Sequence, residues 1–297
     1  MRRMLLSALV AGATVLPGAS AVAQGVFVSP SEVRSMQDSG RLVRVLDVGR
    51  THEQWNAGHI AGSIEFSLSW VVVTRDGIPN ELPKVAVLDS VFESQGIGDS
   101  TIVVVYGDPL AAARVWATLD LLGHPRSYLL DGGLARWTSE GHPLSEEHSS
   151  PRPGRFTPRL QQQRLVDAAW IRARLDDPSM LLVDARSPGE YAGTQQSMQV
   201  PRPGHIPGAR SVFWRRLLQS DAMPVLRDRA ELGQLLAMPA ATTDFIAYCR
   251  TGHMASMLYA VARELALPVK LYDPSFVEWS SRADLPVEQG PPGGATR

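Results

Sequence analysis

Short apolar runs recur along the chain, and those at residues 41–48, 101–107, 181–186 and 244–249 contain the β-branched residues that favour strands. Between them lie segments with apolar residues at helical spacing, among them 29–36, 113–122, 166–175 and 255–266. Ser29 and Asp167 stand where helix N-caps are expected, and Pro30 suits a first helical position. This alternation predicts an α/β fold in which mainly parallel sheets carry helices on both faces.

The same order of elements occurs twice. A Gly-His-Ile motif follows the first strand of each half, at His59 and at His205. When the halves are aligned without gaps, Gly107 takes the place of Cys249. Each half closes with a tryptophan six residues after an aspartate, at Asp131 and Trp137 and at Asp273 and Trp279. A unit this long is a duplicated domain, because solenoid repeats have periods of roughly 20–50 residues.

Composition shifts mark the expected boundaries. Residues 24–145 and 164–287 form the two predicted domains. Residues 146–163 are rich in proline and charge and have no apolar period, so they are predicted to be a linker. Residues 288–297 are predicted to be a flexible tail.

The first 23 residues have the pattern of a secretory signal peptide. Two arginines precede a long apolar stretch, and Ala-Val-Ala offers a cleavage site after Ala23. A membrane anchor is disfavoured because Pro17 and two glycines interrupt the apolar run. We therefore expect export to the bacterial periplasm and no stable membrane association after cleavage.

Charge and composition exclude several classes of partner. The formal net charge of the 297 residues is −1 and the pI is near 6.7, so no basic footprint for nucleic acid or an anionic membrane surface is present. Clustered cysteines and histidines are missing from the sequence, which predicts no metal site and no cofactor. Any anionic substrate must be held by local groups.

Cys249 is the only cysteine of the chain. It ends a strand-like run and is followed by Arg250, Thr251, Gly252, His253 and Met254 in front of an amphipathic segment. In a turn between a strand and a helix, Gly252 allows tight curvature, and backbone N–H groups can gather around an anion. Arg250, together with His253 if protonated, adds positive charge. The loop predicts a reactive thiolate rather than an inert buried thiol.

These residues resemble the tandem-domain rhodanese family, the thiosulfate/3-mercaptopyruvate sulfurtransferases. The motifs that carry the resemblance are VDAR at 183–186, YAGTQ at 191–195, GHIPGA at 204–209 and CRTG at 249–252. The resemblance covers nearly the whole mature chain. It implies two rhodanese-like domains of which only the second is catalytic, since Gly107 and Asp108 replace the nucleophile in the first.

The resemblance also implies the chemistry. Cys249 would take the sulfane sulfur of a small anionic donor, thiosulfate or a related compound, and pass it from a persulfide to cyanide or a thiol. Two alternatives stay open. One is a 3-mercaptopyruvate sulfurtransferase, and the other is a persulfide relay or protein-binding module whose acceptor is a protein thiol.

Glu190 departs from the family pattern, in which an arginine at this position grips the donor. Arg186 and Arg202 are the candidates to replace that arginine. A phosphatase of similar fold is disfavoured because Ala255 stands where its phosphate-binding arginine would be. Asp47, Asp184 and the two motif histidines occur in both halves, which predicts structural roles for them.

Overall fold

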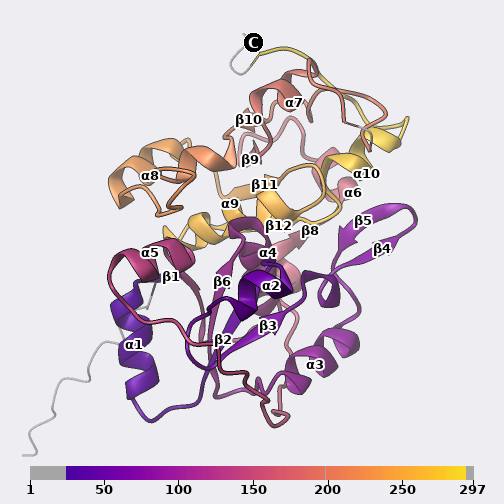
Figure 1. Cartoon of the computed structure of the whole chain (residues 1–297). Coiled ribbons are helices and arrows are strands. Elements are labelled where there is room, and N and C mark those ends of the chain that lie inside the picture. Colours follow the sequence, from indigo (N-terminus) through magenta and orange to yellow (C-terminus); the bar gives the residue numbers. More distant parts are fainter. Residues whose placement is uncertain (1–24, 198, 292–297) are drawn as a thin grey trace, which may run out of the picture.

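The computed structural model of the protein describes residues 25–197 and 199–291. It contains two α/β domains, drawn in Figure 1 with the first domain below the second. The predicted signal peptide and residues 292–297 of the predicted tail lie outside the described residues. No described helix is both long enough and apolar enough to cross a membrane.

In the described part of the chain, the first domain has a five-stranded sheet in the order β1-β7-β6-β2-β3, with all neighbouring strands parallel. The strands are β1 (Phe27–Val28), β2 (Val43–Val48), β3 (Ser63–Phe66), β6 (Ile102–Gly107) and β7 (Ser127–Leu130). Apolar side chains of α1 and α5 pack on one face and those of α3 and α4 on the other. The helices are α1 (Pro30–Asp38), α2 (His52–Asn56), α3 (Val85–Ser94), α4 (Pro109–Leu121) and α5 (Gly133–Ser139).

A small antiparallel hairpin, β4 (Val73–Arg75) and β5 (Ile78–Glu81), leaves the first domain after the short 3₁₀ helix η1 (Leu68–Trp70). In Figure 1 this hairpin rises beside the second domain. The sequence analysis did not predict this hairpin because its strands are short, although the Asp76-Gly77 pair between them is a common hairpin turn.

The second domain repeats the plan. Over the residues that the structure describes, its sheet has five strands in the order β10-β9-β11-β12-β8, again all parallel. The strands are β8 (Leu165–Val166), β9 (Met180–Asp184), β10 (Arg210–Ser211), β11 (Asp244–Tyr248) and β12 (Val269–Tyr272). Side chains of α6, α7 and α10 pack on one face and those of α8 and α9 on the other. The helices are α6 (Ala168–Arg172), α7 (Pro188–Ala192), α8 (Arg229–Leu235), α9 (His253–Glu264) and α10 (Ser275–Ser281), with 3₁₀ turns η2 (Gln162–Arg164) and η3 (Trp214–Leu217).

Strand register supports the alignment of the two halves. Asp47 pairs with Tyr106 between β2 and β6, and Asp184 pairs with Tyr248 between β9 and β11. Gly107 and Cys249 are therefore the next residues at equivalent strand ends. The predicted α/β fold with two domains of the same plan is confirmed.

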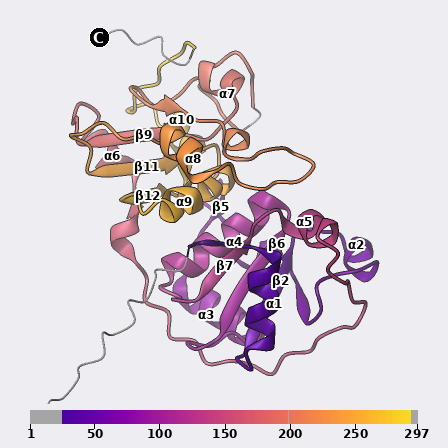
Figure 2. The same cartoon turned by 90° about the vertical axis from the view of Figure 1, so that its left-hand side faces the viewer.

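The two domains meet through α4 and α9, which lie against each other in Figures 1 and 2. Both helices are buried along nearly their whole length, and one apolar cluster runs through both domains. The rings of Trp116 and Tyr259 approach across this contact, with centroids 6.2 Å apart. The loop that connects β11 to α9 contacts the first domain, because Asn80 hydrogen-bonds Thr251 in this loop.

The predicted linker has no helix or strand between residues 146 and 161, but it is not free of the first domain. Phe156 is buried against the ring of Phe92. Backbone N–H groups of Arg159 and Gln161 donate to the carbonyls of Leu122 and Leu121, each at 2.7 Å. The segment thus follows the surface of the first domain, held by backbone hydrogen bonds rather than by an apolar period.

The tail requires a correction at its start. The flexible segment was expected from residue 288, but Glu288 pairs with His205 in an antiparallel bridge, with N–H to carbonyl distances of 2.8 and 3.0 Å. The N–H of Gly290 also donates to the carbonyl of Ala192. The same bridge joins Ser145 to His59 in the first domain. The second domain therefore extends at least to Gly290.

Candidate active site

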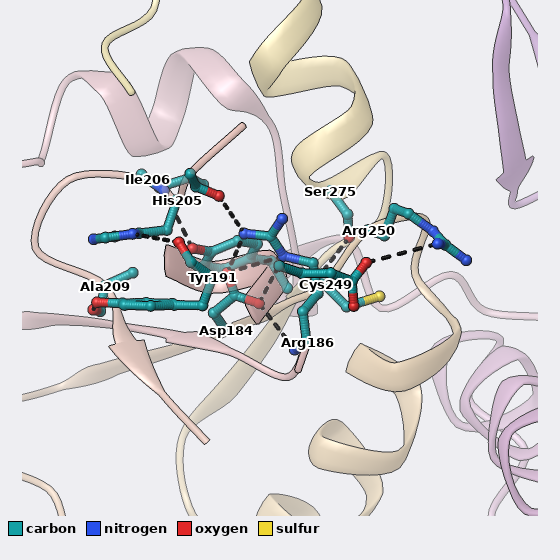
Figure 3. A network of polar contacts seen from close by, with 12 residues as sticks. Asp184, Arg186, Tyr191, His205, Ile206, Ala209, Cys249, Arg250 and Ser275 are labelled. Atoms are coloured by element: carbon teal, nitrogen blue, oxygen red, sulfur yellow. Dashed lines mark hydrogen bonds and ion pairs between the residues drawn. The ribbon is translucent and has the colours of Figure 1, made fainter. Parts of the chain in front are cut away.

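Cys249 follows β11 at the carboxyl edge of the second sheet, where loops of α/β domains bind ligands. Its side chain is 0% exposed. The loop 249–252 turns into α9 at Gly252, which has a φ of +91° and serves as the N-cap. The N–H of Gly252 donates to the Cys249 sulfur at 3.1 Å. Figure 3 shows Cys249 with Arg250 and Ser275 at one end of a polar network that reaches Asp184.

The loop surrounds the sulfur with N–H donors, as the sequence predicted. Hydrogen bonds from the N–H groups of Ala255, Thr251 and Gly252 lower the pKa of the thiol. Burial acts in the opposite direction and is the larger effect, so the pKa of Cys249 is raised above its usual value. The loop was expected to favour a thiolate, but in the free protein burial of the sulfur favours the protonated thiol instead.

This raised pKa predicts the pH dependence of thiol reactivity. Iodoacetamide reacts with the thiolate, whose fraction increases as pH rises toward the pKa. We expect the alkylation rate of Cys249 to keep increasing between pH 7 and 9.5, whereas an ordinary free thiol levels off near its pKa of about 8.5. Intact mass reports this residue alone, because the chain has one cysteine. A rate that is already flat at pH 8 would contradict the prediction.

Arg250 lies at the open side of the loop, with 40% of its side chain exposed. One of its terminal nitrogens, Nη1, is 3.6 Å from Glu190 Oε1 and 3.4 Å from Ser197 Oγ. Glu190 is the third residue of α7 and forms a capping box with Ser187. Its Oε1 is buried and accepts no hydrogen bond from the described residues. Arg250 is thus a cation next to Cys249, and the carboxylate of Glu190 balances its charge.

Neither Arg186 nor Arg202 is placed to replace the missing family arginine. Arg186 is buried, donates to both carboxylate oxygens of Asp184 and to the carbonyl of Gly204, and stacks on Phe276. The Asp184 carboxylate, acting against burial, raises the pKa of Arg186. The guanidinium of Arg202 instead caps the end of α10 by donating to the carbonyls of Trp279, Ser280, Arg282 and Leu285. Both were candidates because the sequence shows where the arginines are. It does not show which carbonyl and carboxylate groups the fold places next to them.

The other loop residues differ in what they contact. Thr251 is 6% exposed, and its hydroxyl accepts a hydrogen bond from the amide of Asn80 at 3.1 Å. Met254 packs on the apolar cluster shared by the domains, which favours a core role. Burial, helped by the positive charge of Arg114, lowers the pKa of His253 to about 4. His253 is therefore neutral at pH 7 and does not add the positive charge that the sequence suggested.

The first domain has no equivalent of this loop. One residue, Asp108, separates β6 from α4, whereas four residues separate β11 from α9. A Cβ atom on Gly107 would lie 2.1 Å from the carbonyl oxygen of Val48, so no side chain fits where Cys249 stands in the second domain. The Asp108 carboxylate already accepts hydrogen bonds from the first N–H groups of α4. These features support the prediction that the first domain is not catalytic.

The residues shared by both halves have structural contacts. The Nδ1 atoms of His59 and His205 bond the carbonyls of Trp55 and Tyr191, and each histidine stacks on that same aromatic ring. Asp47 pairs with Arg50 as Asp184 pairs with Arg186. Trp137 and Trp279 are buried and donate to the carbonyls of Pro143 and Pro286. Equivalent contacts in the half that contains Cys249 and in the half that lacks it favour structural roles for these residues.

Two residues that reach the loop from the first domain were missed by the sequence analysis. Arg114 is buried in α4, and Asn80 belongs to the hairpin β4-β5. A signal for Arg114 was present, because it is a lone arginine in the apolar segment 110–119. Asn80 had no such signal, since asparagine near a turn is ordinary.

Comparison with known proteins agrees with this geometry. The family model "Rhodanese-like domain" matches residues 29–140 and 167–282. A thiosulfate sulfurtransferase of Pseudomonas aeruginosa is 32% identical over 269 residues, covering 89% of this chain and 97% of its own length. The sulfur carrier protein TtuD of Thermus thermophilus is 32% identical over 268 residues, covering 84% and 91%.

Among solved structures, the Tum1 protein of Saccharomyces cerevisiae superposes with a TM-score of 0.77 at 22% identity, over 89% of this chain and 98% of its own. At that identity the likeness concerns the fold. Both matched segments fall within the two domains described above, and they leave out the linker. The chain therefore belongs to the rhodanese family, as a tandem of two rhodanese-like domains.

Proposed function

We propose that this protein is a sulfurtransferase that accepts a sulfane sulfur on Cys249 and passes it to a thiol or to cyanide. The observation that carries the proposal is the position of the Cys249 sulfur, which lies at the start of α9 among the N–H groups of Thr251, Gly252 and Ala255. These donors stabilise negative charge on sulfur, in the thiolate and in a persulfide alike. The thiosulfate sulfurtransferases and the sulfur carrier protein among its relatives support the same chemistry.

The reaction has two displacements. The Cys249 thiolate attacks the outer sulfur of thiosulfate, a new S–S bond forms, and the original S–S bond breaks with its electron pair leaving on sulfite. An acceptor thiolate or cyanide then attacks the outer sulfur of the persulfide, and Cys249 returns as a thiolate. Neither step needs an external oxidant or reductant, because sulfur moves as a neutral atom while one anion attacks and another leaves. The loop N–H groups serve both steps because the charge stays on sulfur at this site.

Intact mass of the reduced protein tests the proposal. Incubation with thiosulfate should add the mass of one sulfur atom, and cyanide should remove it. Parallel incubation with 3-mercaptopyruvate tests the alternative donor. If folded protein with a titratable thiol gains no sulfur from either compound, the proposal fails for small-molecule donors.

A protein acceptor is the second candidate, favoured by the relative that is named a sulfur carrier protein. In that case Cys249 would pass its sulfur to the thiol of a partner protein and turn over slowly with cyanide. The two functions separate when loaded protein is offered equal concentrations of a small thiol and of a cysteine-containing protein. Faster discharge to the protein thiol supports the relay.

Export is a further part of the proposal, supported by the signal-like residues 1–23. Mature protein recovered from the periplasm should begin at Gln24. Recovery of the full-length chain from the cytoplasm alone would contradict this.

Glu190 should limit the use of thiosulfate. The donor is a dianion, and Glu190 balances the charge of Arg250 at the mouth of the loop. Glu190→Gln keeps the capping box and removes one like charge. We expect the thiosulfate concentration for half-maximal loading to fall about fivefold, the effect of roughly 1 kcal/mol from one screened charge.

Glu32→Gln is the matched control, because Glu32 occupies the same capping-box position at the start of α1. It should leave the half-maximal concentration unchanged. Equal effects of the two substitutions, or no effect of Glu190→Gln, would show that Glu190 does not influence donor binding.

A further inference from the structure

We propose that the non-catalytic first domain holds the loop 249–252 in its reactive shape through Arg114 and Asn80, so that one active site is built from both domains. Arg114 and Asn80 are positioning residues in this proposal, since they reach the nucleophile only through other residues. The main experiment that tests it measures sulfur loading, so this inference rests on the proposed function. The structural support for it is a set of contacts between the two domains.

Arg114 is the centre of these contacts. Its side chain is 0% exposed in α4 of the first domain. Nη1 donates to Asp273 Oδ1 of the second domain, and Nη2 donates to the carbonyl of Asn80, both at 2.5 Å. A guanidinium removed from water is costly unless it is paired, and breaking such a pair leaves a buried charge. Arg114 therefore holds Asp273 of the second domain and Asn80 of the first domain in fixed positions relative to each other.

Asp273 connects this ion pair to the loop. It follows β12, and its Oδ2 accepts a hydrogen bond from the N–H of Leu82 in the first domain at 2.8 Å. Its carbonyl oxygen lies 3.1 Å and its Oδ1 3.3 Å from the position of a Cβ on Gly252. Gly252 is the residue whose N–H donates to the Cys249 sulfur. A shift of Asp273 would therefore move a donor of the sulfur.

Asn80 makes the second connection. Its Nδ2 donates to the hydroxyl of Thr251, and the N–H of Thr251 is close enough to the sulfur to lower the pKa of the thiol. Asn80 has a φ of +64°, in the left-handed region that few residues with a side chain adopt. The ion pair between Arg75 and Glu81 ties the two strands of its hairpin together at 2.7 Å. The hairpin thus holds the amide of Asn80 at the loop in a defined geometry, which is consistent with a positioning role.

The pseudosymmetry of the two domains supplies a matched contact that lacks the loop. Asp131 is the counterpart of Asp273, and its Oδ1 accepts a hydrogen bond from the N–H of Leu226 in the second domain at 2.9 Å. It too pairs with an arginine, Arg136, at 2.6 Å. Both aspartates thus join the domains, but Asp131 stands in the half in which Gly107 replaces the cysteine.

Single-turnover loading of the full chain by thiosulfate tests the proposal. Asp273→Asn should lower the loading rate at saturating thiosulfate by roughly tenfold to a hundredfold, the range expected when a reacting group is misplaced by about 1 Å. Asp131→Asn should load at the wild-type rate. The thiosulfate concentration for half-maximal loading should change little in either variant, because the effect is on position rather than on donor affinity.

Asn80→Gly separates positioning from stability. Glycine adopts a positive φ freely, so the fold should keep or increase its unfolding midpoint while the bond to Thr251 is lost. We expect loading to slow about fivefold. The same loss in Thr251→Val, with no further loss in the double variant, would place both residues in one contact. Cys249 alkylation at pH 9 should slow in parallel, and it needs no sulfur donor.

The outcomes distinguish the two proposals. If the wild-type protein gains no sulfur, the proposed function fails. The alkylation rates of the variants, compared with the wild-type rate, then test the role of the first domain by themselves. If Asp273→Asn and Asp131→Asn load and alkylate alike, or if Asn80→Gly behaves as wild type, the first domain does not position the loop and the inference is overturned.

Discussion

Cys249→Ser should abolish sulfur uptake and lower sulfur transfer by about 10⁴-fold or more, the order of loss found when an enzyme nucleophile is removed. The serine oxygen would lie at the same end of β11, but its hydroxyl stays protonated at neutral pH and attacks sulfur poorly. The surrounding N–H groups cannot compensate, because they stabilise an anion that the serine does not form. Steady-state transfer from thiosulfate to cyanide and intact mass measure the loss.

Cys249→Ala provides the companion variant. Cys249 is buried in the apolar cluster, so both substitutions require a check that the unfolding midpoint stays close to wild type. Both folded variants should be equally inactive. Transfer by either one above the rate without protein would mean that another group of the chain accepts the sulfur, and the proposed mechanism would fall.

Gly252→Ala should have the second largest effect. Gly252 has a φ of +91°, which costs a residue with a side chain roughly 1–2 kcal/mol. The new methyl group would also lie 3.1 Å from the carbonyl oxygen of Asp273 and 3.2 Å from Arg114 Nη1, two groups that the ion pair holds in place. The loop must therefore move, and the N–H of residue 252 moves away from the sulfur. We expect loading at saturating thiosulfate to fall roughly a hundredfold.

Gly62→Ala is the control for backbone strain. Gly62 has a φ of +76° in the first domain, and nothing lies within 4 Å of the position of a Cβ on it. Its variant should lose a similar amount of stability but load at the wild-type rate. If both glycine variants lose loading equally, general destabilisation explains the result and the crowding at Gly252 does not.

Local sequence signals predicted the helices and strands around the site. Ser29 and Asp167 cap the first helix of each domain, as expected from residues that compete for free backbone N–H groups. The apolar run that ends at Tyr248 forms β11, and Gly252 is the N-cap of α9. These features depend on interactions between residues that are close in the sequence, so the local sequence is sufficient to predict them. The position of Cys249 at a strand end follows from them.

The protonation states of Cys249 and His253, and the contacts of the arginines near the site, could not be predicted from local sequence. The state of the thiol depends on burial by α4 and the apolar cluster, which come from distant segments, and burial outweighs the loop N–H groups. Arg186 and Arg202 have suitable side chains, but the fold turns them to Asp184 and to the end of α10. Burial, together with the positive charge of Arg114 from the other domain, lowers the pKa of His253 and keeps it neutral at pH 7.

Short-range patterns were enough to predict the duplicated α/β plan and the family, and the single cysteine of the sequence made Cys249 the candidate nucleophile. The folded structure was needed to show that Glu190 balances the charge of Arg250 and that residues of the other domain contact the loop. Those relations join residues as far apart as Asn80 and Thr251. Their energies come from desolvation and from charges brought together across the interface, and neither exists until the two domains pack.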